Sequence, residues 1–373
     1  MYTLTRVRLF VTACFVLLAL AEGQTNTLEL QRTVDAWRAA RAVSGVAVVT
    51  LSARGQQTVV SGTTQSGGAT PFDAHSTVIL GSTAKGLVAI GALRLVDAGR
   101  LNLDAPVAPF MPEFRTPSGL ENRLTMRQLL THQGGMPTYF AEFSGERSLE
   151  GVARTLARDP RVTEPSASLG LYSNTGYSLA ALVIARAAGQ PFERFMTDQV
   201  FKPLGLEDTG FYGSALLEPR SAPSGHLEVL GVRPLTAIFG PEYAGASSTL
   251  AMSISDVARY LRALLNGTQL EGGRLLSPAS FTELLRFQNT VRTQNGPFTW
   301  NTVERRYALG WFLDTLNGTP ILEHVGSTGT TSSMFMIAPA RGVAVGIILN
   351  HDRAGGGLEN LGRTLMAAML EGC

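Results

Sequence analysis

A serine and a lysine three positions apart form the first candidate for chemistry in this sequence. They are Ser82 and Lys85, in the segment Ser82-Thr-Ala-Lys85. At positions i and i+3 of a helix, the hydroxyl and the amine lie on one face within reach of each other. A serine hydroxyl is a weak nucleophile until a neighbour takes its proton, and a lysine can take it when burial lowers the lysine pKa. The spacing therefore indicates nucleophilic catalysis by a serine.

Lysine is scarce in this chain, which makes Lys85 informative. The 31 basic residues are 29 arginines and two lysines, Lys85 and Lys202. An arginine could not replace a lysine base, because its guanidinium stays protonated. The alternative interpretation is a capping serine beside an exposed lysine. It fits poorly, because residues 87–96 are apolar on most faces and predict a buried helix.

A tyrosine and an asparagine two positions apart form the second candidate, in the segment Tyr172-Ser-Asn174. A phenol beside a lysine can relay a proton, and an amide side chain can hold a substrate carbonyl or the lysine itself. The segment also lies between a loop and a helical pattern at residues 177–188. In isolation it is more typical of a structural junction than of a catalytic site.

The segment His324-Val-Gly326, followed by Ser327, is the third candidate. It ends a predicted strand at the edge of a sheet, where backbone N–H groups remain available to bind a ligand carbonyl. His132-Gln-Gly134 matches the same pattern near the end of a short predicted helix, so the pattern alone decides nothing. We interpret His132 as structural and place His324, Gly326 and Ser327 at the substrate.

Motifs for metals and cofactors are missing from the sequence. No cluster of histidine, acidic or cysteine residues has the spacing of a zinc site, and there is no P-loop, Rossmann glycine pattern or G-x-S-x-G motif. We therefore expect neither a metal ion nor an organic cofactor.

Strand patterns occur at both ends of the chain and helical patterns lie between them. A helix at 28–42 precedes two strands at 45–51 and 58–60, and residues 82–98 read as the buried helix. Thr125 can cap a short helix at 126–131, and Ser253 or Ser255 can cap a later one. Further strands are predicted at 307–316, 321–325, 333–337 and 343–349, and a last helix at 358–370.

This order of elements predicts an α/β protein of the α+β kind. Two strands, then helices, then consecutive hairpin strands imply an antiparallel sheet built from both chain ends and flanked by helices. We expect the sheet region at about 28–80 and 300–373, with an inserted, mainly helical lobe at about 82–290. Together they would form a single domain over residues 22–373.

Residues 1–21 have the layout of a secretory signal peptide. Arg6 and Arg8 precede an apolar run at 9–20 that is too short to span a bilayer, and Ala19-Leu-Ala21 fits a cleavage site. A buried N-terminal helix and a lipoprotein attached through Cys14 are the alternatives. We expect an exported protein, periplasmic or extracellular, without a stable membrane span in the mature chain.

Removal of Arg6 and Arg8 leaves 29 basic and 29 acidic residues. A chain with no net charge offers no surface that tracks phosphates, so nucleic acid is not an expected partner. Cleavage also removes Cys14 and leaves Cys373 as the one thiol, which excludes a disulfide within the mature chain. Its stability must then come from the core.

Taken in order, the three motifs resemble the serine penicillin-recognising superfamily, which includes class C β-lactamases, DD-peptidases and related esterases. The resemblance extends over nearly the whole mature chain. Segments 101–107, 124–132, 201–206 and 245–259 also look like segments of this family. The resemblance implies a β-lactamase-like fold.

The resemblance also implies a role for each candidate. Ser82 is the nucleophile, Lys85 its general base and Tyr172 the proton relay to the leaving group. Asn174 orients the substrate, and the backbone N–H groups of Ser82 and Ser327 form an oxyanion hole.

The third motif departs from the class C pattern. Class C β-lactamases carry K-T-G where this chain has His324-Val-Gly326, and a histidine there is similar to some DD-carboxypeptidases, D-aminopeptidases and esterases. The histidine replaces a permanent positive charge, suited to a substrate carboxylate, with one that depends on pH. This difference argues against efficient β-lactamase activity.

We therefore expect an exported serine hydrolase that forms an acyl-enzyme on Ser82. Its substrate would be a small molecule or peptide, either a short-chain ester or a D-Ala-type cell-wall peptide. The alternatives are a β-lactamase and a non-catalytic peptidoglycan-binding protein with the same fold.

Overall fold

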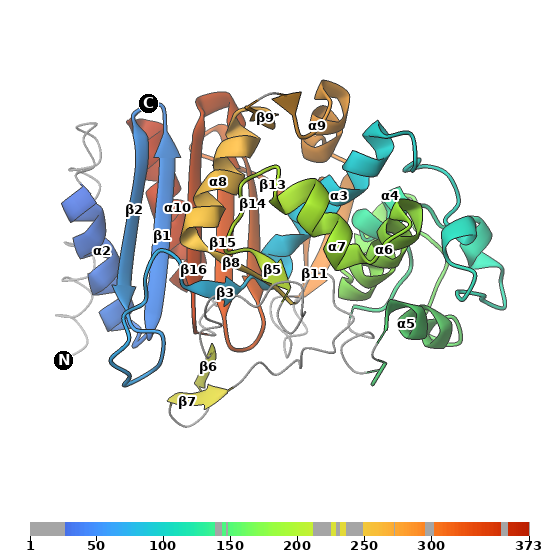
Figure 1. Cartoon of the computed structure of the whole chain (residues 1–373), viewed down its shortest axis with the longest axis horizontal. Helices are drawn as coiled ribbons and strands as arrows, with labels where there is room; N and C mark the ends of the chain where they lie inside the picture. The colour runs from blue at the N-terminus through green and yellow to red at the C-terminus, as the bar shows by residue number, and fades with distance from the viewer. Residues whose placement is uncertain are drawn as a thin grey trace.

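The structure is a computed structural model that describes residues 27–138, 144–146, 148–211, 225–228, 232–235, 249–271, 273–294, 302–351 and 357–372. A large sheet lies beside a mainly helical lobe (Figure 1). The predicted signal peptide, residues 1–21, lies outside the described residues. Within the described ranges, no helix is both long enough and apolar enough to cross a membrane.

The large sheet has nine strands drawn from both halves of the chain. In spatial order they are β2 (Gly55–Gly62), β1 (Gly45–Ser52), β16 (Val343–Leu349), β15 (Ser332–Ala338), β14 (Thr319–Ser327), β13 (Phe312–Leu316), β12 (Thr302–Tyr307), β11 (Asn289–Gln294) and β4 (Leu169–Leu171). Every neighbouring pair is antiparallel except β11 with β4. The predicted fold class, an antiparallel sheet built from both chain ends, is confirmed.

Helices cover both faces of the sheet. Val46 and Val48 of β1 belong to one apolar cluster with α2 (Thr27–Ala40) and α10 (Glu359–Glu371). The alternate residues Ala47 and Val49 belong to a second cluster, which includes α8 (Ile254–Leu265). Because successive side chains of a strand point to opposite faces, this division places α2 and α10 on one face and α8 on the other.

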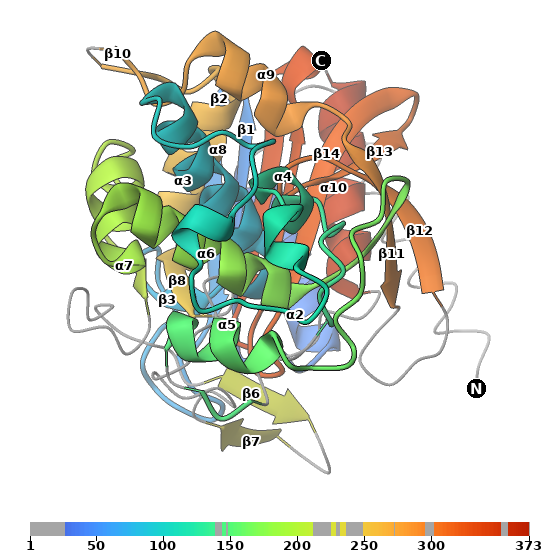
Figure 2. The ribbon, with the colours of Figure 1, turned by 90° about the vertical axis from the view of Figure 1, so that its right-hand side faces the viewer.

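The lobe consists of short helices around α3 (Figure 2). Its helical elements are η1 (Gly81–Ala84), α3 (Lys85–Asp97), η2 (Ala108–Phe110), η3 (Leu120–Asn122), α4 (Met126–Leu130), α5 (Leu149–Leu156), α6 (Asn174–Ala188), α7 (Phe192–Met196), η5 (Thr197–Phe201) and α9 (Pro278–Leu285). A small sheet joins β3 (Thr77–Ile79), β8 (Leu250–Ser253) and β5 (Gly210–Phe211). Two hairpins, β6 (Gly225–Glu228) with β7 (Val232–Leu235) and β9 (Gln269–Leu270) with β10 (Gly273–Arg274), and the turn η6 (Pro339–Arg341) complete the described elements.

The predicted buried helix is confirmed, although it begins differently. Ser82 lies in the 3₁₀ turn η1, and the α-helix itself begins at Lys85. Ten of the thirteen residues of α3 are buried, as an apolar pattern on most faces predicts. The predicted cap at Thr125 is confirmed, and it forms a capping box with Gln128. Ser253, one of the two serines predicted as possible caps, caps α8.

The predicted strand at 307–316 is wrong as a single element. β12 ends at Tyr307 and β13 begins at Phe312. Gly310 between them has a φ of 83°, and a Cβ there would lie 2.7 Å from the backbone of Gly86. The chain turns at this point to pack against α3, which an alternating apolar pattern does not reveal.

Candidate active site

Ser82 lies on a turn that is hydrogen-bonded to the large sheet. The hydroxyl of Ser333 on β15 donates to the carbonyl of Leu80 at 2.6 Å and lies 2.7 Å from Thr83 Oγ1. Thr331 Oγ1 donates to the carbonyl of Ile79 at 2.7 Å. These bonds hold η1 against the sheet, with the Ser82 side chain half-buried.

Two glycines allow the backbone of β14 to approach the Ser82 turn closely. A Cβ on Gly326 would lie 2.0 Å from the carbonyl of Leu80 and 2.9 Å from the backbone nitrogen of Ser82. A Cβ on Gly81 would lie 2.9 Å from the backbone nitrogen of Ser327. The turn and the end of β14 are therefore in direct backbone contact.

Lys85 connects the serine turn to the second motif. Its side chain is fully buried, and its Nζ donates to Ser82 Oγ at 3.0 Å and to Asn174 Oδ1 at 2.7 Å. The same nitrogen lies 5.0 Å from the ring centroid of Tyr172 and 5.2 Å from that of Tyr177. Ser82, Lys85 and Asn174, all selected from the sequence, are thus joined by hydrogen bonds. Tyr172, also selected, places its ring beside the amine.

The local sequence fixes the position of Tyr172 and Asn174. Tyr172 follows the short strand β4, and Ser173 caps α6 by accepting the backbone N–H of Gly176 at 2.9 Å. Asn174 is the first residue of α6, so its side chain lies at the helix start and reaches Lys85. The junction expected from the sequence and the candidate site are the same segment.

The third motif lies where β14 extends beyond β13. β13 pairs with β14 as far as Glu323, whereas β15 pairs with it as far as Ser327. His324 and Gly326 therefore lie on the part of the strand that β13 does not cover. The predicted position at the edge of the sheet is wrong, because β14 is an interior strand that pairs with β15 along this segment. Ser327 is exposed at its end.

The His324 imidazole is buried rather than open to solvent. It is 2% exposed, its Nε2 lies 3.5 Å from Tyr307 Oη, and its ring centroid lies 4.9 Å from that of Phe312. Burial lowers the pKa of His324 to about 3, and the positive charge of Lys85 contributes. The imidazole is neutral at pH 7, so the expected pH-dependent charge does not occur near neutrality.

Several aromatic residues near the lysine were not selected from the sequence. They are Tyr177, Tyr307 and Phe312, all buried, together with His132, which was interpreted as structural. The His132 ring centroid lies 4.3 Å from that of Tyr172. The one signal in the sequence for His132 was its match to the H-x-G pattern.

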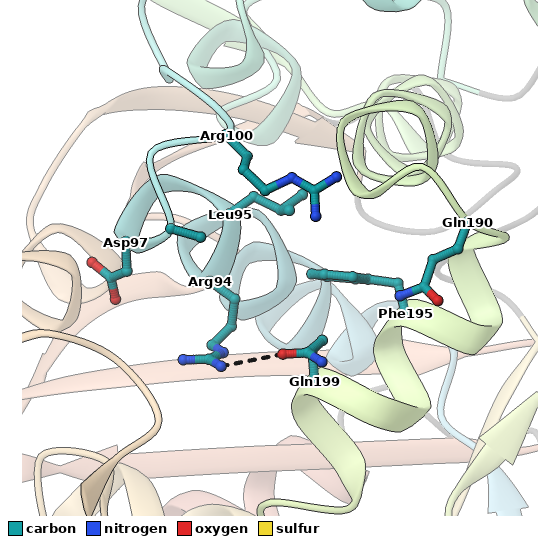
Figure 3. A pocket seen from close by; sticks show the side chains of 8 residues that line it. Arg94, Leu95, Asp97, Arg100, Gln190, Phe195 and Gln199 are labelled. Atoms are coloured by element: carbon teal, nitrogen blue, oxygen red, sulfur yellow. Dashed lines mark hydrogen bonds between the residues drawn. The ribbon is translucent and has the colours of Figure 1, made fainter.

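A hollow of about 290 Å³ lies at the other end of α3 from Ser82 (Figure 3). Three of its polar side chains have structural partners, since Arg94 donates to Gln199 Oε1 at 3.3 Å and Asp97 accepts the backbone N–H of Ser277 at 2.8 Å. Asp97 points away from the other labelled side chains. The hollow therefore belongs to the packing of α3 and not to the candidate site.

Metal ligands do not gather around the serine turn. In the part of the chain that the structure describes, no group of three or more histidine, cysteine or acidic residues is placed to hold a metal ion. The candidate site is built from a hydroxyl, an amine, an amide and aromatic rings.

Comparison with known proteins gives a consistent result over most of the chain. The family model described as Beta-lactamase matches residues 30–367. Penicillin-binding protein 4 of Amycolatopsis lactamdurans is 29% identical over 346 residues, which cover 91% of this chain and 89% of that protein. Esterase EstB of Burkholderia gladioli is 34% identical over 197 residues, which cover 47% of this chain and 48% of the esterase.

A solved structure agrees at the level of the fold. The D-amino acid amidase of Ochrobactrum anthropi SV3, in complex with L-phenylalanine amide, superposes with a TM-score of 0.75 at 24% identity. The match covers 90% of this chain and 96% of the amidase.

Proposed function

The chain belongs to the Beta-lactamase family of serine hydrolases, and from this membership we propose that it hydrolyses an ester or amide through an acyl-enzyme on Ser82. We propose further that residues 1–21 direct export to the periplasm or the extracellular space. Residues 22–373 would then form one hydrolase domain.

The observation that carries the proposal is the position of the buried Lys85 amine. Its Nζ lies 3.0 Å from Ser82 Oγ, which is hydrogen-bond distance for a base and the nucleophile that it activates. Asn174 Oδ1 accepts a second Nζ–H bond and so holds the amine toward the serine.

Acylation follows from this arrangement. Lys85 Nζ, as the free amine, takes the proton of Ser82 as Oγ forms a bond to the substrate carbonyl carbon. The carbonyl oxygen becomes an oxyanion, and the backbone N–H groups of Ser82 and Ser327 would stabilise it. The close contact at Gly81 and Gly326 supports this role, because it brings the two backbone segments together.

Proton transfer to the leaving group completes the first half of the reaction. The proton on Lys85 passes through the Tyr172 hydroxyl to the leaving oxygen or nitrogen as its bond to the carbonyl carbon breaks. Water then attacks the acyl-enzyme by the same route in reverse, which releases the acid and restores Ser82.

The charges near His324 favour a substrate that places no carboxylate beside this residue. His324 is neutral at pH 7, because its pKa is lowered to about 3. The nearby guanidinium of Arg305 pairs with Glu323 and stacks on the ring of Phe312 at 4.3 Å. An uncharged ester or amide therefore fits better than a substrate that needs a free cation.

The relatives bear names of two kinds of protein, a penicillin-binding protein and an esterase. A short-chain ester and a D-Ala-type peptide are therefore both candidates. Hydrolysis rates for a short-chain p-nitrophenyl ester and for a peptide ending in D-Ala-D-Ala separate them, and we expect the ester to be the faster.

Covalent labelling tests the proposal directly. The intact mass of the protein after exposure to a fluorophosphonate is expected to rise by one adduct, and Ser82→Ala is expected to remain unlabelled. Absence of an adduct on the wild type, or an adduct that persists in Ser82→Ala, would contradict an acyl-enzyme on Ser82. A protein that binds a cell-wall peptide without hydrolysing it would be the non-catalytic alternative.

The N-terminal sequence of protein recovered from cells tests export. A mature chain that begins at Glu22 supports the signal peptide. Processing that globomycin blocks would instead indicate a lipoprotein attached through Cys14.

A further inference from the structure

His132 hydrogen-bonds to the chain on both sides of Tyr172. The backbone N–H of Leu171 donates to the carbonyl of His132 at 2.9 Å. The backbone N–H of Ser173 donates to Nδ1 of the same residue at 3.0 Å. Tyr172 itself donates its N–H to the carbonyl of Arg292 at 3.1 Å. The backbone around the phenol is therefore held at three consecutive positions, two of them by one residue.

The imidazole of His132 also packs on the phenol ring. The two ring centroids are 4.3 Å apart and the planes are inclined by 35°. The rings of Tyr307 and Tyr177 lie 4.8 Å and 5.3 Å from the same imidazole. With 2% of the residue exposed, the imidazole fixes one side of the Tyr172 ring.

The backbone conformation of His132 makes both hydrogen bonds available. Its φ is 63°, in the left-handed region that non-glycine residues adopt uncommonly and in which histidine, asparagine and aspartate are enriched. The chain turns here after α4, so that both the carbonyl and the side chain of His132 accept hydrogen bonds from the segment 171–173. Such strain persists where the surrounding contacts enforce it.

The ring is neutral and carries a buried donor. Burial lowers the pKa of His132 well below its usual value, and the positive charge of Lys85 adds to the effect. Because Nδ1 accepts a hydrogen bond, the proton resides on Nε2. Nε2 is buried without a hydrogen-bond partner among the described residues. An unsatisfied donor of this kind costs stability, so packing alone does not account for the imidazole.

We propose that His132 is a positioning residue that holds the Tyr172 phenol beside the Lys85 amine. Through Ser173 it also fixes the first turn of α6, from which Asn174 binds the lysine. The inference rests on the proposed hydrolase function, in which Tyr172 passes the proton to the leaving group. His132 acts through Tyr172 and does not contact the reacting atoms.

Two substitutions separate the contributions of the imidazole. His132→Phe keeps a flat ring and removes the Nδ1 acceptor, whereas His132→Asn keeps an acceptor and tolerates the left-handed backbone. On an ethyl ester of a short-chain acid, whose alkoxide leaving group needs the relayed proton, we expect His132→Phe to lower kcat by about 100-fold with little change in KM, because the relay is misplaced while substrate contacts remain. We expect His132→Asn to recover part of this loss. His75→Asn, at a partly exposed histidine paired with Asp208, is the control and keeps the wild-type kcat.

A double-mutant cycle with Tyr172→Phe tests whether His132 acts through the phenol. If it does, His132→Phe has little further effect on kcat once the Tyr172 hydroxyl is absent. Equal factors in the two backgrounds, or an unchanged kcat in His132→Phe, would overturn the proposal. Circular dichroism and Tm establish that each variant is folded.

A spectroscopic readout keeps the inference testable if the hydrolase proposal fails. With ¹³Cζ-labelled tyrosine, the Tyr172 signal is assigned as the one lost in Tyr172→Phe. We expect that signal to shift or broaden in folded His132→Phe and to remain in His75→Asn. An unchanged Tyr172 signal would overturn the positioning role whatever the activity, whereas failure to label Ser82 would contradict only the proposed function.

Discussion

Lys85 and Asn174 are joined by a 2.7 Å hydrogen bond from Nζ to Oδ1, although 89 positions separate them in the chain. Lys85 is the first residue of α3 and Asn174 the first residue of α6. Two packed helices therefore begin at the same point, and each supplies one partner of this bond. The position of the amine depends on the packing of both helices and not on the local sequence around Ser82 alone.

Asn174→Asp is expected to lower kcat at pH 7 by about 100-fold, because a carboxylate beside Lys85 favours the ammonium form, which cannot accept the Ser82 proton. The shape of the side chain is almost unchanged, so substrate binding should change little. The dependence of kcat on pH from 6 to 10 measures the effect. A profile shifted to higher pH is expected, and a variant profile that overlays the wild type would contradict the role of this bond.

Gly326→Ala is expected to reduce the free energy of unfolding by about 2–3 kcal/mol and to abolish acylation of Ser82. The new Cβ would lie 2.0 Å from the carbonyl of Leu80, so the turn and β14 must separate. Gly273→Ala on β10 is the matched control, because a Cβ there meets nothing within 4 Å. Urea denaturation and fluorophosphonate labelling of both variants provide the comparison. Labelling of Gly326→Ala at the wild-type rate would disprove the need for this contact.

Ser333→Ala is expected to cost about 1–3 kcal/mol of stability, because its buried hydroxyl bonds to the carbonyl of Leu80 and to Thr83. Loosening of the turn should also slow acylation. Ser332→Ala is a close control, since that neighbouring hydroxyl is buried without a hydrogen-bond partner among the described residues. Thermal denaturation is expected to show a lower Tm for Ser333→Ala and an unchanged or higher Tm for Ser332→Ala. The reverse order would contradict the anchoring of the turn by β15.

Stability is expected to fall as the pH drops below about 6.5, the usual pKa of histidine in an unfolded chain. The folded pKa of His324 is about 3, so between these two values the unfolded state binds the proton and the folded state does not. Each such group lowers the free energy of unfolding by about 1.4 kcal/mol per pH unit in that window.

His324→Gln isolates this contribution. Between pH 7 and pH 5 the wild type is expected to lose about 2 kcal/mol more stability than the variant, as measured by urea denaturation at both pH values. Equal losses in the two proteins would show that His324 is not buried in its neutral form.

The elements with strong periodic patterns could be predicted from the sequence. An apolar pattern on most faces identified α3 as buried, and short apolar runs separated by turn signals identified β14, β15 and β16. Their positions relative to one another also followed, because consecutive hairpin strands have few alternative arrangements. For these elements the local pattern and the final packing agree.

Short or irregular elements could not be predicted in this way. β4 has three residues and pairs in parallel with β11, which is more than a hundred positions away. Neither strand was predicted: β4 lies within the lobe that was predicted to be helical, and β11 lies at the end of that lobe, before the predicted sheet region. Their pairing depends on tertiary contacts, which a local pattern does not contain.

In the candidate site, too, features set by the local sequence could be predicted and features set by tertiary contacts could not. The spacing of Ser82 and Lys85 suggested their contact, because one helical turn determines it. The partners of Tyr172 depend on His132, which reaches it from 40 positions earlier, and the neutral form of His324 depends on burial by residues from other strands. The sequence identified Ser82, Lys85 and Tyr172 as candidate reacting groups, but it did not identify the residues that determine their orientation and charge.

The hydrogen bond between Thr83 and Ser333 spans 250 positions, so the turn that carries Ser82 is synthesised early and the strand that holds it is synthesised near the end. A nascent chain, or a fragment that stops before β15, contains Ser82 and Lys85 without the strand that holds them. Such a chain would be inert toward esters and amides. The proposed hydrolytic activity would therefore begin only when the last strands have joined the sheet.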